Sequence, residues 1–121
     1  MASLRSLMRG AHVGIIELCN ISKRNALSLS TLNELCHLVQ YLENDPNIRA
    51  VVIQNTGPVF SSGHDLKEIQ SLQKESNLVK LEELFEVCSL TMRSIAESKK
   101  PYVAKVNGVA TAAGCQLVAS E

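Results

Sequence analysis

The pattern of hydrophobic and polar residues predicts a chain of alternating strands and helices. Three apolar runs have the length of a strand: residues 13–18 (VGIIEL), 50–54 (AVVIQ) and 102–106 (YVAKV). Short continuous runs of this kind, rich in Val and Ile, are typical of buried strands. Strands that alternate with helices favour an α/β fold with crossover connections.

Two helices are predicted between these strands from apolar residues that recur every three or four positions. The two stripes are Leu32, Leu35, Val39 and Leu42, and then Leu81, Leu84, Phe85, Cys88, Met92 and Ile95. A serine at 28 or 30 should cap the first helix, and the Asp-Pro pair at 45–46 should end it near Asn44. The Lys-Lys-Pro run at 99–101 should end the second helix.

The remaining segments are predicted from their polarity and from their turn residues. Residues 66–70 should form a helical turn, and residues 70–77 an exposed spacer. Residues 1–12 contain Arg and Ser but no acid, which is typical of a transit peptide or of a frayed N-terminus. Residues 112–121 open a helix without a C-terminal cap, so we expect a truncated chain, with a frayed terminal helix as the alternative.

The composition is that of a soluble domain and excludes several functions. The 121 residues carry 12 basic and 12 acidic side chains, a net charge of +0, so the basic face of a nucleic-acid-binding protein is absent. The 4 cysteines include no C-x-x-C pair, so we expect free thiols rather than a metal site or a redox pair. No apolar run approaches the roughly 20 residues of a membrane span.

Candidate chemistry lies in two runs of small residues that follow predicted strands. These runs are FSSGHD at 60–65 and NGVATAAGCQ at 107–116. Each places bare backbone where open α/β sheets bind ligands, and two converging N–H groups would form an oxyanion hole for an acyl group. Small-residue loops are common, so ordinary tight turns are the alternative.

Three motifs in order make the chain resemble a known family. KRNAL at 23–27, FSSGHDLKE at 60–68 and KPYVAKVNGVATAAGCQL at 100–117 resemble the enoyl-CoA hydratase/isomerase (crotonase) superfamily. The resemblance runs from about Val13 to Glu121 and covers about the N-terminal half of the family's fold. It implies an α/β fold, a spiral of ββα turns that is truncated here. Residues 13–121 would form the N-terminal part of an acyl-CoA-binding domain.

The resemblance also implies a site for a coenzyme A thioester. The two backbone donors of its oxyanion hole fall on His64, after Gly63, and on Ala113, before Gly114. His64 replaces the small residue usual in the family, but a backbone N–H survives that change. The implied contacts to the coenzyme are Ser62, Gly63, His64, Asp65, Leu66, Lys67, Ala113, Gly114, Lys23 and Arg24.

One departure from the family's pattern concerns catalysis. Active hydratases of the family carry a glutamate two residues after the second glycine, where this chain has Gln116. An amide cannot exchange a proton as a carboxylate does. The family's second catalytic glutamate would fall beyond Glu121. We therefore expect an acyl-CoA-binding protein without hydratase activity, and no cofactor or metal.

Other interpretations of the same residues stay open. His64 could act as a general base, although a packed or solvated loop histidine is the simpler interpretation. Asp65 fits a helix cap better than a catalytic acid, and Ser61 and Ser62 lack the G-x-S-x-G motif of a hydrolase. The rival functions are a lyase, isomerase or thioesterase that uses other residues, and a non-catalytic short isoform. The resemblance implies a mitochondrial protein of fatty-acid metabolism and, at full length, a homo-oligomeric trimer or hexamer.

Overall fold

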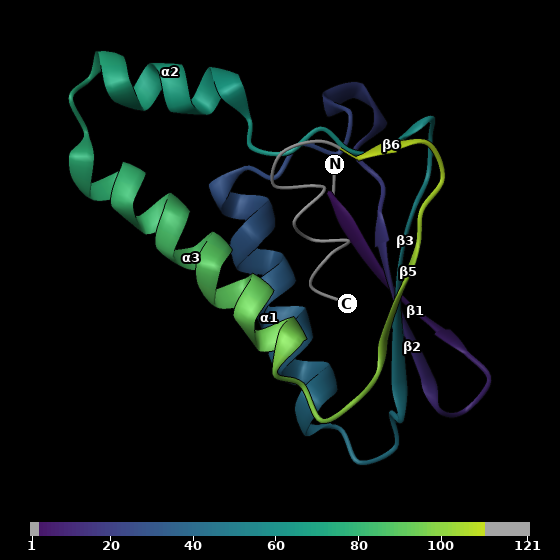
Figure 1. Cartoon of the computed structure of the whole chain (residues 1–121). Coiled ribbons are helices and arrows are strands. Elements are labelled where there is room, and N and C mark those ends of the chain that lie inside the picture. The colour runs from purple at the N-terminus through teal and green to yellow at the C-terminus, as the bar shows by residue number, and fades with distance from the viewer. Residues whose placement is uncertain (1–2, 111–121) are drawn as a thin grey trace.

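A four-stranded sheet with helices on one face forms the body of the protein (Figure 1). The computed structural model describes residues 3–110. The strands are β1 (Leu4–Arg9), β2 (Val13–Leu18), β3 (Ala50–Asn55), β4 (Val59–Ser61), β5 (Tyr102–Lys105) and β6 (Val109–Ala110). The helices are the 3₁₀ turn η1 (Ile21–Lys23), α1 (Leu29–Asn44), α2 (Leu66–Lys74) and α3 (Leu78–Ala96). The predicted α/β fold is confirmed.

The sheet has the order β1-β2-β3-β5, in which the last three strands are parallel and β1 is antiparallel to β2. Parallel neighbours need a crossover connection. Helix α1 makes the crossover from β2 to β3, while β4, α2 and α3 lie between β3 and β5 in the chain. The carboxyl ends of the three parallel strands therefore lie at the same edge of the sheet.

The core lies between the sheet and helices α1 and α3. Its largest fully buried side chains are Phe60, Ile16, Leu18, Leu27, Leu32, Leu35, Ile53, Leu84, Val39 and Val51. The two predicted helical stripes supply most of the helix side of this core, as the sequence period requires. Phe85 was predicted in the second stripe, but its side chain is 49% exposed. It lies instead beside His64.

Helix boundaries agree with the predicted signals at most ends. The Ser28 hydroxyl accepts a hydrogen bond from the Thr31 N–H at 3.2 Å, and α1 ends at Asn44. Helix α2 is longer than predicted, because it continues to Lys74 through the segment expected to be a spacer. Leu72, three residues after Ile69, is buried and anchors this extra turn.

The N-terminal segment contains a strand, which differs from the frayed terminus that was one of the two interpretations of residues 1–12. Leu4–Arg9 forms β1, which pairs with β2 from Leu4 opposite Leu18 to Arg9 opposite Val13. The segment is held because Leu4 is buried in the core and Arg5 pairs with Glu17. Residues 4–9 thus contribute an edge strand to the main sheet.

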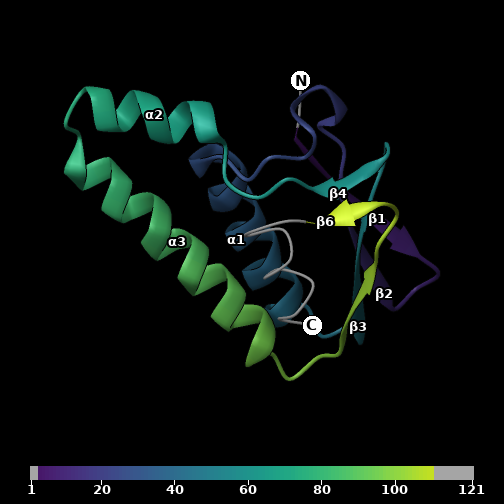
Figure 2. The same ribbon diagram turned by 45° about the horizontal axis from the view of Figure 1, so that its top comes forward.

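A second, two-stranded sheet brings the two motif-bearing segments together. Strands β4 and β6 are parallel neighbours, with Val59 opposite Val109 and Ser61 opposite Ala110 (Figure 2). Strands of three and two residues are too short to give a hydrophobic period, so the sequence did not predict them. Their pairing places the starts of both small-residue runs at one edge.

Candidate functional site

A surface pocket of about 300 Å³ lies where the chain leaves β4 and enters α2. Its lining comes from two segments that are some 40 residues apart in the sequence. The lining residues are Ser22, Lys23, Arg24, Ala26, Ser62, His64, Asp65, Leu66 and Lys67. Seven of the eight predicted ligand contacts from residues 23–67 line this pocket, and the eighth, Gly63, lies within the same loop. The fold therefore gathers the first two motifs into one site.

The corner after β4 is fastened to the 24–27 segment by backbone hydrogen bonds. The Leu27 N–H donates to the Gly63 carbonyl at 2.7 Å, and the Ser62 N–H donates to the Arg24 carbonyl at 3.1 Å. Gly63 has φ +86°, a conformation that side chains disfavour. The corner is therefore a well-defined turn held by hydrogen bonds, and glycine is the residue that adopts its backbone conformation.

Two buried polar residues, Ser61 and Asn25, also connect the corner after β4 to the 24–27 segment. The Ser61 hydroxyl donates to the Asn25 carbonyl at 2.8 Å and accepts from the Gly63 N–H at 3.2 Å. Ser61 is fully buried and Asn25 is 3% exposed. These contacts support the view that Ser61 is structural, since its hydroxyl is occupied by the turn and lies in the interior.

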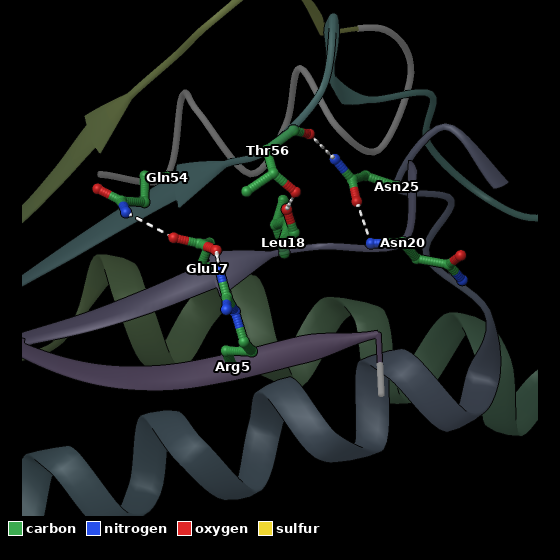
Figure 3. Close-up of polar contacts among 7 residues, drawn as sticks. All are labelled: Arg5, Glu17, Leu18, Asn20, Asn25, Gln54 and Thr56. Carbon is green, nitrogen blue, oxygen red and sulfur yellow. Dashed lines mark hydrogen bonds and ion pairs between the residues drawn. The ribbon is translucent and has the colours of Figure 1, made fainter. Parts of the chain in front are cut away.

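Asn25 is the residue that fixes the 20–25 loop, and the sequence analysis missed this role. Its side-chain amide donates to the carbonyls of Val59 at 2.9 Å and Thr56 at 3.3 Å, and its Oδ1 accepts from the Asn20 N–H at 2.8 Å. Figure 3 shows the amide between Asn20 and Thr56. Asn25 also has φ +52°, which Asn tolerates better than most residues. An Asn within a turn motif was the available signal.

An ion pair between an exposed arginine and a buried glutamate lies near this loop, on the face of the sheet opposite α1. Glu17 on β2 is 5% exposed, pairs with Arg5 on β1, and accepts a hydrogen bond from Gln54 on β3 at 2.8 Å (Figure 3). The hydrogen bond from Arg5 lowers the pKa of Glu17, burial opposes that shift, and the bond from Gln54 adds to it. The pair ties β1 to the sheet and lies outside the pocket.

His64 is one of the residues that line the pocket. None of residues 3–110 accepts a hydrogen bond from its backbone N–H. Its ring meets the Phe85 ring edge to face, with centroids 5.2 Å apart and planes at 85°. Burial lowers the pKa of His64, while the Glu68 carboxylate and the Leu27 backbone act in the opposite direction. The net effect lowers the pKa of His64 and favours the neutral imidazole.

The charged residues of the pocket divide into cations at the surface and acids used as helix caps. Lys23, Arg24 and Lys67 are exposed. Asp65 accepts from the N–H groups of Lys67 and Glu68, which confirms its interpretation as a cap. Glu68 accepts from the Leu29 N–H at 2.9 Å, at the start of α1. The charged side chains at the rim that are not used as helix caps are thus positive, and they suit an anionic ligand.

The second corner begins at β6 and is braced by Asn55. The Asn55 side chain donates to the Asn107 carbonyl at 2.8 Å and accepts from the Asn107 N–H at 2.9 Å. Gly108 has φ +94°, and a Cβ there would lie 1.8 Å from the Pro58 carbonyl oxygen. Glycine is therefore the residue that fits position 108.

The rest of the second predicted corner lies outside the described residues. This applies to Ala113, Gly114 and Gln116. No group of three His, Cys, Asp or Glu side chains within residues 3–110 is arranged to hold a metal ion. Over the same residues, no helix has both the length and the apolar character of a membrane span.

Comparison with known proteins identifies the family. The model of the enoyl-CoA hydratase/isomerase family matches residues 8–120. The chain therefore belongs to the enoyl-CoA hydratase/isomerase family.

Particular relatives narrow this assignment. The chain is 46% identical over 105 residues to enoyl-CoA hydratase domain-containing protein 3, mitochondrial, of Homo sapiens, and 48% identical to the protein of that name in Danio rerio. It is 31% identical over 110 residues to enoyl-CoA hydratase, mitochondrial, of Pongo abelii. These alignments cover 87% of this chain but only 34 to 35% of the relatives, so the chain spans about a third of their length.

Solved structures show the same fold. Human enoyl coenzyme A hydratase domain-containing protein 3 superposes with a TM-score of 0.90 at 40% identity, over 98% of this chain and 46% of that one. An enoyl-CoA hydratase of Mycobacterium smegmatis also superposes with a TM-score of 0.90, at 36% identity, over 99% of this chain and 46% of that one. The chain is thus an enoyl-CoA hydratase-like protein with part of the crotonase fold.

Proposed function

We propose that this chain binds acyl or enoyl thioesters of coenzyme A through the pocket between residues 22–26 and 62–67. The observation that carries the proposal is the convergence of two family motifs on one pocket with exposed cations at its rim. Phosphates and a pyrophosphate are the anionic part of such a ligand, and Lys23, Arg24 and Lys67 supply the matching charge.

The thioester oxygen would be held at the corner after Gly63. The His64 N–H has no acceptor within residues 3–110, and an unpaired N–H at a built turn is suited to an oxyanion. The family resemblance assigns the second donor to Ala113. The parallel pairing of β4 with β6 supports this assignment, because only three sequence positions separate Ala113 from Ala110 at the end of β6.

We also propose that the chain does not hydrate enoyl thioesters. Gln116 stands in the slot that the resemblance assigns to a catalytic glutamate, and an amide cannot act as a general acid or base. Relatives named mitochondrial support a mitochondrial location. A role in fatty-acid metabolism, and a trimer or hexamer for the full-length family member, are part of the same proposal.

Binding of a nonhydrolysable acyl-CoA analogue to Gly63→Val tests the site. A branched side chain at φ +86° would displace the loop and move the His64 N–H away from the ligand. We expect the Kd, measured by calorimetry, to rise at least about tenfold, or about 1.4 kcal/mol.

Gly10→Val is the matched control. Gly10 has φ +64° in the β1–β2 hairpin, and a Cβ there would meet nothing within 4 Å. The Gly10→Val substitution therefore introduces a similar backbone strain at a position away from the pocket. Equal affinity of Gly63→Val and Gly10→Val for the analogue would refute the site. Lys67→Glu offers a second test that leaves the turn intact, and unchanged affinity at low ionic strength would count against the proposal equally.

A further inference from the structure

The corner between β4 and α2 contains a backbone N–H whose direction is fixed from the other side of its own peptide unit. The Gly63 carbonyl accepts a hydrogen bond from the Leu27 N–H at 2.7 Å. This carbonyl and the His64 N–H belong to one peptide unit, and no peptide bond within residues 3–110 is cis. The two groups of a planar trans peptide unit point in opposite directions. The His64 N–H is therefore directed away from Leu27.

The preceding peptide unit of the corner is held by Ser61. The Gly63 N–H donates to the Ser61 Oγ at 3.2 Å, and the same hydroxyl donates to the Asn25 carbonyl at 2.8 Å. One buried hydroxyl thus accepts from one backbone group and donates to another. Both peptide units that flank the Gly63 Cα are held in this way, one by Leu27 and one by Ser61.

The restraint from Ser61 matters because the residue between the two units is a glycine. Gly63 has φ +86°, and glycine reaches many other backbone conformations at little cost. Without the hydroxyl, the Gly63 N–H would be a buried donor without an acceptor, which is unfavourable. The first peptide unit would then turn toward another partner. A rotation at Gly63 would also change the direction of the His64 N–H.

We propose that Ser61 is a positioning residue, whose buried hydroxyl sets the direction of the His64 N–H that receives the thioester oxygen. This inference rests on the proposed function. Donors that are already aligned need no reorganisation when the ligand arrives, and a hydrogen bond weakens steeply as its angle departs from linear. Ser61 itself is fully buried, so it acts on the ligand through Gly63 and His64.

The binding test compares two ligands that differ at the carbonyl alone. Butyryl-CoA carries the thioester oxygen, and S-butyl-CoA has a CH₂ group in its place. Ser61→Ala should raise the Kd of butyryl-CoA, measured by calorimetry, about fivefold, because the donor is misaligned rather than lost. The Kd of S-butyl-CoA should stay within about twofold of its value for the parent chain. Ser61→Cys places a weak sulfur acceptor at this position, should act in the same direction, and is used if Ser61→Ala does not fold.

The amide proton of His64 provides a direct spectroscopic signature in protein labelled with nitrogen-15. Its resonance should move downfield when butyryl-CoA is added to the parent chain, and much less when S-butyl-CoA is added. In Ser61→Ala the movement with butyryl-CoA should fall to less than about half, because the hydrogen bond is poorly aligned. A parent resonance that responds equally to both ligands, or an undiminished response in Ser61→Ala, would overturn the inference.

Thr91→Val is the matched control. Thr91 is also fully buried, and its hydroxyl donates to the Val87 carbonyl at 2.7 Å within α3, away from the corner. Both Kd values should stay within about twofold in this variant. Equal losses for the two ligands in Ser61→Ala, or the same loss in Thr91→Val, would overturn the positioning role while leaving coenzyme A binding in place. Failure of the parent chain to bind either ligand would overturn the proposed function as well.

Discussion

Asn25→Asp should destabilise the protein strongly, although it changes one amide nitrogen to oxygen. The substitution keeps the Oδ1 acceptor for the Asn20 N–H and keeps a residue that tolerates φ +52°. It removes the donor to the carbonyls of Val59 and Thr56, and it places a carboxylate against them in a site that is 3% exposed.

The magnitude follows from the bond lost at Thr56 and from the buried carboxylate, because the Val59 carbonyl keeps a donor, the Asn55 side-chain amide at 3.2 Å. A carbonyl that loses its donor costs roughly 1–3 kcal/mol, and a buried charge without a partner adds to that cost. The longer bond, to Thr56 at 3.3 Å, belongs at the low end of that range. We therefore expect the free energy of unfolding at pH 7 to fall by about 3 kcal/mol. With an m-value of about 1.5 kcal/mol/M, the urea midpoint should fall by about 2 M.

The dependence on pH provides a second signature. Burial and two carbonyl oxygens should raise the pKa of the introduced carboxyl above its value of about 3.9 in the unfolded chain. The loss of stability in Asn25→Asp is then largest above the folded-state pKa of the introduced carboxyl. It decreases as the pH falls through that pKa and is smallest below about pH 4. At low pH the protonated group can also donate one of the lost bonds.

Urea unfolding followed by circular dichroism at pH 7 and pH 4.5 measures both effects. Asn33→Asp on α1 is the control, since it makes the same change of charge at a half-buried residue. A loss below about 1 kcal/mol in Asn25→Asp at pH 7 would refute the view that this amide holds the pocket loop. A loss that does not change with pH would refute the electrostatic part of the argument.

Three other substitutions give independent tests. Gly108→Ala should lower the free energy of unfolding by about 2 kcal/mol or more, because its Cβ would meet the Pro58 carbonyl in a left-handed conformation; an unchanged thermal melt would contradict this. Arg5→Leu should destabilise most above the pKa of Glu17, which Arg5 lowers, and progressively less as acid protonates that carboxylate; a difference in urea midpoint that is constant with pH would disprove the pairing argument. Gln116→Glu should not produce hydration of crotonyl-CoA, because water addition also needs a second proton-transfer group; loss of enoyl absorbance faster than without protein would show otherwise.

The sequence by itself determined the elements that have a strong local period. The first helix was predicted from its apolar stripe, its serine cap and its Asp-Pro end, and α1 runs from Leu29 to Asn44. These features depend on contacts within a few residues, so they can be recognised along the chain. The family was recognised from the resemblance of three motifs, at residues 23–27, 60–68 and 100–117, to those of a known family.

Other features were decided only by contacts between distant segments. Strand β1 exists because Leu4 and Arg5 find partners on β2, and β4 and β6 are too short to be strands without each other. The environment of His64 depends on Phe85, which lies on another helix. The role of Asn25 depends on carbonyls more than 30 residues away. A side chain's burial and its hydrogen-bond partners are set by what packs against it, and the packing of distant segments is a property of the whole fold.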